Sequence, residues 1–162
     1  MNQQKRIIIA VIVLIFIGAA VLGLEVVRRQ RVTDTDLEPG SVPIYVDGKM
    51  EAAFTPGDLE SLEQVSFKDA EEGKTQEGWM LRDVLLLHLS EERLTPETRV
   101  TVSSSSREKS AELTWAEVKD EENMVMFDLS GRGTLKLVSK LDKLDVRDEW
   151  VQDTDRIDVE AP

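Results

Sequence analysis

An uninterrupted apolar run near the amino terminus is the strongest pattern in this 162-residue chain. Residues 7–24 contain no charged side chain, and basic residues flank the run on both sides. A helix that continued to residue 27 would be roughly 30 Å long, which matches the hydrocarbon core of a bilayer. The pattern therefore predicts one transmembrane helix over residues 7–27, followed by a tethered domain.

A cleaved secretory signal is the alternative to an anchor, because a signal also combines a basic start with an apolar centre. The run is longer than the about 7 to 15 apolar residues of a signal, and Ala20-Val21-Leu22 is a poor cleavage site. These features favour an uncleaved anchor.

Positive charges on both sides of the apolar run do not decide the orientation of the anchor. The very short tail before the run favours a single-pass protein of the cell membrane with an extracytoplasmic carboxy-terminal domain.

Short apolar runs separated by turns characterise the chain from Pro43 onward. Pro43–Val46 and Met50–Phe54 flank an Asp47-Gly48 turn, which is a typical hairpin pattern. Alternating or apolar runs predict further strands at Val65–Phe67, Arg99–Ser103, Ala111–Leu113, Met124–Leu129, Leu135–Leu141 and Ile157–Val159.

Helices are expected at three places. Thr55 followed by Pro56 is a helix-start pattern, and Thr114 with Glu117 forms a capping-box pattern before Trp115–Lys119. Gly78–Leu89 is apolar around most of its circumference and is expected to form a buried helix. Many short strands with few helices predict an α+β domain rich in β structure.

The domain organisation follows from these patterns. Residues 28–42 lack apolar periodicity and contain Pro39-Gly40, as is typical of a linker. The expected order is a short tail at 1–6, a transmembrane anchor at 7–27, a linker at 28–42 and one domain at 43–162.

The charge of the chain restricts its partners. Residues 28–162 contain 18 basic and 31 acidic residues, a formal charge of −13. Nucleic acid is therefore excluded as an expected partner, because binding to it requires basic neutralisation of phosphates. The same charge disfavours adhesion of the domain to anionic lipid. The chain contains no cysteine, which excludes disulfides and thiolate ligation of a metal.

The order of elements resembles a known family. The segments YVDGK, FTPGDLESL, GWMLRDVLL, LSGRGTLKLV and WVQDTDRIDV are similar to the oxidoreductase molybdopterin-binding domain of the sulfite oxidase family. The resemblance covers most of residues 43–160 and rests mainly on Gly78–Leu85 and Gly133–Val138. It implies a β-rich α+β fold of the sulfite oxidase type.

The same resemblance argues against the family's chemistry. In its enzymes a cysteine upstream of the first motif binds molybdenum, whereas the corresponding stretch Val65–Glu77 contains none. The resemblance thus implies a reduced, cofactor-free relative that retains a shallow pocket. Because fold alone does not give function, the pocket residues have to be sought separately.

Other candidate chemistry is sparse. His88 is the only histidine, so a zinc site lacks a second imidazole or thiol. Ser106 and Lys109 have Ser-x-x-Lys spacing but lack the other motifs of penicillin-recognising enzymes. Trp79, expected on a loop that enters the buried helix, and Arg107 are the candidate pocket residues, while Trp115 and Trp150 are expected to fill the core.

Two hypotheses for function follow. The preferred one is a non-catalytic, membrane-anchored extracytoplasmic domain that binds a protein or a small ligand and uses no metal or cofactor. The alternative is a redox accessory or enzyme that retains a pterin or another organic cofactor without cysteine ligation.

Overall fold

The computed structural model describes residues 37–162. The predicted anchor at 7–27 and residues 28–36 of the predicted linker lie outside the described residues. Among residues 37–162, no helix is both long enough and apolar enough to cross a bilayer.

Two β-sheets form the framework of the domain, and few helices accompany them, as the β-rich α+β pattern predicts. The five-stranded sheet has the order β2 (Lys49–Phe54), β1 (Val42–Val46), β9 (Arg156–Glu160), β5 (Arg99–Ser104) and β6 (Lys109–Thr114). The four-stranded sheet has the order β3 (Gln64–Lys68), β4 (Thr75–Met80), β7 (Met126–Leu129) and β8 (Leu135–Val138). β1 and β9 are parallel, and the other neighbouring strands are antiparallel.

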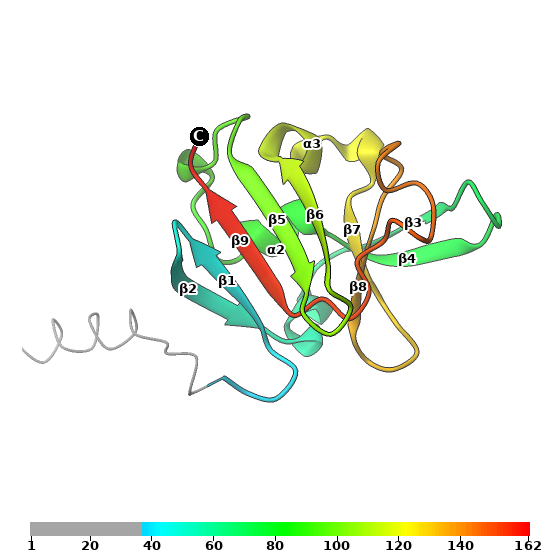
Figure 1. Cartoon of the computed structure of the whole chain (residues 1–162), viewed down its shortest axis with the longest axis horizontal. Helices are drawn as coiled ribbons and strands as arrows, with labels where there is room; N and C mark the ends of the chain where they lie inside the picture. The colour runs from blue at the N-terminus through cyan, green and yellow to red at the C-terminus, as the bar shows by residue number, and fades with distance from the viewer. Residues whose placement is uncertain (1–36) are drawn as a thin grey trace, which may run out of the picture. The chain divides into compact units, whose positions relative to one another are not determined.

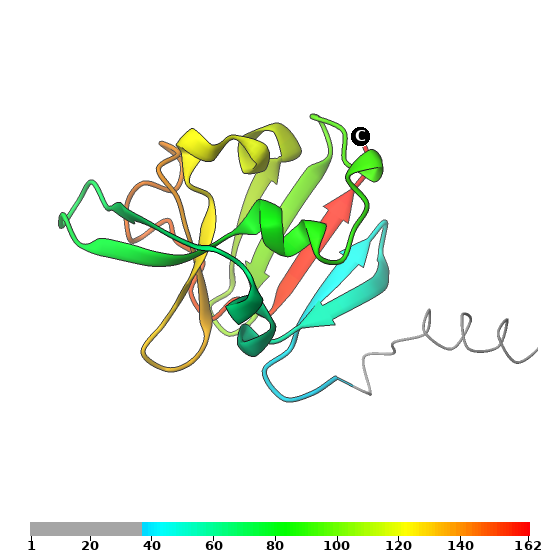
Figure 2. The same cartoon turned by 180° about the vertical axis from the view of Figure 1, so that it is seen from behind.

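The helical segments are short. Among residues 37–162, two are α-helices, α2 (Leu81–Leu86) and α3 (Trp115–Lys119), and the 3₁₀ turns are η2 (Pro56–Ser61), η3 (Glu91–Arg93) and η4 (Glu121–Asn123). α2 lies behind the five-stranded sheet in Figure 1 and in front of it in Figure 2, so it covers one face of that sheet. The β3–β4 hairpin extends away from the rest of the domain (Figure 1).

The main core lies between the five-stranded sheet, the two α-helices and one face of the four-stranded sheet. Ile44, Val100, Val102 and Ile157 point to this core and are fully buried. Most of their strand neighbours, such as Thr101, are partly or fully exposed on the opposite face, although Pro43 beside Ile44 is buried. This alternation is the expected result of a strand that buries one face only.

The four-stranded sheet is covered on both faces. Trp79 and Phe127 belong to the main core, whereas the neighbouring residues along the two strands, Met80 and Met126, belong to a second cluster. Trp150, from the segment between β8 and β9, packs into this second cluster. The second face of the sheet is therefore buried by a loop and not by a helix.

Several local predictions are confirmed. β1 and β2 form the expected hairpin around Asp47 and Gly48, both of which have positive φ. α3 begins at the expected capping box, in which Glu117 N donates to Thr114 Oγ1 at 3.2 Å and Thr114 N donates to Glu117 Oε2 at 2.8 Å. The segment after Thr55 is helical as expected, but its hydrogen bonding is that of a 3₁₀ turn.

The expected helix over Gly78–Leu89 is wrong. Gly78, Trp79 and Met80 complete strand β4, and only Leu81–Leu86 form a helix. Because β4 is buried on both faces near its end, it is apolar on both sides. Hydrophobic periodicity does not separate such a strand from a buried helix.

Gly78 is required where β4 passes β7. A Cβ atom at this position would overlap the carbonyl oxygen of Phe127 and lie 2.7 Å from its carbonyl carbon. We expect Gly78→Ala to lower the free energy of unfolding by about 3 kcal/mol, because both clashing atoms are backbone. Urea unfolding of the full chain in detergent measures this loss. Gly131→Ala is the control, since nothing lies within 4 Å of the position that its methyl group would take; equal unfolding midpoints for the two variants would contradict the prediction.

Candidate functional site

A hollow of about 430 Å³ lies beside the end of the β3–β4 hairpin. Its walls come from three parts of the chain: residues within 69–76 of the hairpin, residues within 130–136 of the β7–β8 turn and β8, and residues within 147–152. We call it the hairpin hollow. No two of these segments are close in sequence, so the sheet pairing brings them together.

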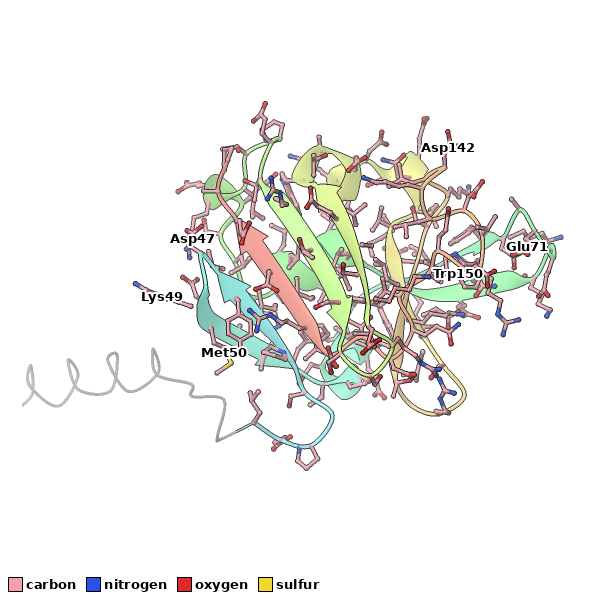
Figure 3. The ribbon with its side chains drawn as sticks, in the orientation of Figure 1. Asp47, Lys49, Met50, Glu71, Asp142 and Trp150 are labelled. Carbon is pink, nitrogen blue, oxygen red and sulfur yellow. The ribbon has the colours of Figure 1, made fainter. Side chains whose placement is uncertain are left out.

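A second hollow, of about 230 Å³, adjoins the first. We call it the arginine hollow, and its lining consists of Arg107, Lys109, Arg147, Asp148, Trp150 and Gln152. Arg147, Trp150 and Gln152 line both hollows, which together form one groove. Figure 3 shows Glu71, at the end of the hairpin, and Trp150 on the same side of the domain.

Trp150 forms the floor of the groove. It is 4% exposed, and its indole Nε1 donates to the carbonyl oxygen of Leu144 at 2.9 Å. Lys136 Nζ lies 4.8 Å from the centre of the Trp150 rings, in a cation–π contact. The same Nζ donates to Gln76 Oε1 and pairs with Asp128 Oδ2, each at 2.9 Å. One ammonium group thus joins β4, β7 and β8 to the loop that carries Trp150.

Asp69 shapes the hairpin wall. Its carboxylate accepts from Glu72 N at 2.6 Å, Gly73 N at 3.1 Å and Gln76 Nε2 at 2.9 Å. The hydrogen bond from the Glu72 amide is the main reason why the pKa of Asp69 is lowered from its ordinary value. The carboxylate is therefore ionised, and its oxygen atoms accept hydrogen bonds from donors within the hairpin.

Asp153 joins the two ends of the groove. Its carboxylate accepts from Thr134 Oγ1 at 2.7 Å, Arg107 Nε at 2.6 Å and an Arg132 amino nitrogen at 2.9 Å. The hydrogen bond from Thr134, followed by those from the two arginines, lowers the pKa of Asp153 to about 2 against the opposing effect of burial. Arg107 belongs to the arginine hollow and Arg132 to the hairpin hollow, so one carboxylate positions a cation in each.

The structure also places the other candidate residues from the sequence. Among residues 37–162, no three histidine or carboxylate side chains converge to hold a metal. His88 does not line the groove; its ring stacks on Phe54 at 6.0 Å, and burial lowers its pKa. Ser106 lies in the β5–β6 turn and not on a helix, so the helical arrangement that a Ser-x-x-Lys nucleophile needs is absent from this turn.

The structure does not bring the two predicted pocket residues together. Arg107 lines the arginine hollow, whereas Trp79 lies in strand β4 within the main core and is 4% exposed. Trp79 Nε1 is buried, and it has no hydrogen-bond partner within the described part of the chain. Trp115 and Trp150 are buried as predicted, but Trp150 also lines the groove.

Sequence reasoning missed the other basic residues of the groove, notably Lys109, Arg132, Lys136 and Arg147. They come from β6, the β7–β8 turn, β8 and the segment before β9. No spacing along the chain links them, since only the tertiary fold places them along one groove. Comparison with known proteins adds no assignment, because no family model matches the chain and no curated protein matches it.

The network around Asp153 predicts a defined pH dependence. Its folded-state pKa of about 2 lies below its ordinary value of 3.8, so its stabilisation is present above pH 3.8 and is lost as the pH falls towards 2. We expect Asp153→Asn to lower the free energy of unfolding by about 1 kcal/mol at pH 7, after allowance for solvent screening. The deficit should shrink between about pH 4 and pH 2.

Urea unfolding at a series of pH values measures this effect, with Asp148→Asn as the control. Asp148 is an exposed carboxylate of the same groove, and none of the described hydrogen bonds uses its side chain. A deficit for Asp153→Asn that stays constant down to pH 2 would rule out the ionised network.

Proposed function

We propose that this chain is a single-pass protein of the cell membrane whose extracytoplasmic domain binds a small ligand or a protein partner without catalysing a reaction. The observation that supports the binding site most strongly is the groove, with its supported floor and its rim of basic side chains. Ligands bind preferentially in concave hollows, and in this groove charged and polar groups take the place of the apolar lining of most small-molecule sites. The apolar run at residues 7–24 supports the anchor.

The proposal includes a distant relationship to the sulfite oxidase family, without its metal. What supports it is the sequence resemblance together with the β-rich α+β architecture. The stretch Val65–Glu77, where the family's cysteine would stand, forms β3, the hairpin end and part of β4, and it lines the hairpin hollow. Here that wall presents carboxylates and Gln76 in place of a thiolate, which is consistent with a retained pocket that holds no molybdenum.

Binding is favoured over catalysis by the state of the carboxylates. Asp69, Glu72 and Asp153 all have lowered pKa values, because hydrogen bonds and neighbouring cations stabilise their ionised forms. A general acid or base works best when its pKa is near the working pH. Glu72 and Asp153 are instead suited to pairing with basic side chains, and Asp69 to holding the end of the hairpin.

Site-specific photocrosslinking tests the binding site. A photoreactive amino acid at Gln152, which lines both hollows, should give discrete adducts in the native membrane. Thr101 is the matched control position, because it is also partly exposed but lies on the open face of the five-stranded sheet. Identical adducts from both positions, or none from Gln152, would contradict a protein partner at the groove.

Cysteine labelling tests the orientation in the membrane. Since the chain contains no cysteine, Asp142→Cys creates a single thiol at an exposed position. We expect a membrane-impermeant maleimide to label it in protoplasts before lysis, because the domain is proposed to lie outside the cytoplasm. Labelling that requires lysis would overturn the proposed orientation but leave the groove untouched.

A further inference from the structure

The arginine hollow is a basic site on a strongly acidic domain. Residues 37–162 contain 15 basic and 29 acidic residues, a formal charge of −14. The lining of the arginine hollow nevertheless includes three cations, Arg107, Lys109 and Arg147, and only one carboxylate, Asp148. Asp153 adds a second carboxylate, but it is shared between Arg107 and Arg132. Glu72 lies 3.9 Å from the Arg147 guanidinium, and Glu71 accepts from Arg147 N at 3.0 Å, so the excess of positive charge is confined to the lining of the hollow itself.

Two of these cations are weakly compensated. The Arg147 side chain is 57% exposed, and its ion-pair partner in the described structure, Glu72 Oε2, is 3.9 Å away. Lys109 Nζ donates to the backbone carbonyl oxygen of Asp148 and not to a carboxylate. By contrast, the Arg93 guanidinium forms two hydrogen bonds of 2.6 and 3.0 Å with Glu51. Arg147 and Lys109 thus retain donors that an incoming anion can use.

Asp153 improves the site for an anion although it is itself acidic. Its Oδ2 accepts a hydrogen bond from Arg107 Nε at 2.6 Å. This bond fixes one edge of the guanidinium and leaves the two amino groups for other acceptors. Guanidinium groups bind phosphate and carboxylate through paired N–H donors, and a pre-positioned guanidinium loses less conformational entropy on binding.

We propose that the arginine hollow binds a compact polyanion, a small molecule with two or more phosphate or carboxylate groups, through Arg107, Lys109 and Arg147. This inference rests on the proposed binding function of the groove and names its ligand class. The hollow of about 230 Å³ limits the anionic part to a few such groups.

The charge of the surrounding surface argues for a compact ligand and against an extended one. At physiological ionic strength, charges are screened over about 8 Å, so a small anion in the hollow is influenced mainly by the local cations. A nucleic acid or an acidic protein would extend over the acidic remainder of the domain and be repelled. The neutral part of a small ligand would occupy the hairpin hollow, whose lining is nearly balanced with four basic and three acidic residues.

Calorimetric titration of the full chain in nanodiscs of uncharged lipid tests the proposal. Pyrophosphate and tricarballylate are the two test anions, at constant ionic strength. We expect one-to-one binding of at least one of them and a loss of affinity of about tenfold in Arg147→Gln, a size typical of one charged contact. The affinity should also fall as salt is added.

Arg99→Gln is the matched control, because it removes the same charge from an arginine that is 55% exposed and ion-paired on the five-stranded sheet. The affinity of the Arg99→Gln variant for the test anion should stay within about twofold of that of the unmodified chain. Lys109→Gln provides a second variant in the hollow, and circular dichroism verifies that each variant is folded. Binding of pyrophosphate alone identifies phosphate as the source of the anionic groups, and binding of tricarballylate alone identifies carboxylate.

Absence of binding by both anions, or equal losses in Arg147→Gln and Arg99→Gln, would overturn the proposal. Such a result would leave the groove itself intact if the Gln152 position still gave discrete photoadducts. Conversely, anion binding without photoadducts would support the ligand class and count against a larger partner.

Discussion

The contact between Lys136 and Trp150 is the interaction on which the proposed site depends. The second face of the four-stranded sheet has no helix to cover it, so its buried methionines need Trp150 from the segment between β8 and β9. The partly buried ammonium group of Lys136 pairs with Asp128, donates to Gln76 and lies over the indole. A backbone hydrogen bond from Leu137 N to Val151 O, 2.9 Å long, holds the same loop to β8. Trp150 therefore forms the floor of the groove and also covers the second face of the four-stranded sheet.

Charge gives this groove its selectivity. The domain as a whole repels anions, whereas the turns that carry Arg107 and Arg132 and the loop that carries Arg147 place cations along one groove. Asp153 holds Arg107 and Arg132 in position, and it adds one negative charge to their surroundings. Such an arrangement discriminates by size, because only a compact anion avoids the acidic surroundings.

Much of the fold can be predicted from local sequence, and the site largely cannot. The Asp47-Gly48 hairpin and the Thr114–Glu117 capping box depend on neighbouring residues, and both predictions are confirmed. The prediction for Gly78–Leu89 is wrong because a strand buried on both faces has the composition of a buried helix. Arg107 is the one predicted pocket residue that lies in the groove. The other groove residues come from distant parts of the chain, and only the tertiary fold brings them together. The anchor and the family resemblance remain predictions from sequence.

The most direct test of an anion site in the groove uses the three tryptophans as internal reporters. Indole N–H resonances of Trp79, Trp115 and Trp150 can be followed in the ¹⁵N-labelled full chain in uncharged nanodiscs while pyrophosphate or tricarballylate is added. Trp150 forms the floor of the groove, whereas Trp79 and Trp115 lie in the main core. We expect a saturable shift of the Trp150 resonance with the other two unchanged. No shift with either anion, or equal shifts of all three resonances, would contradict an anion site above Trp150.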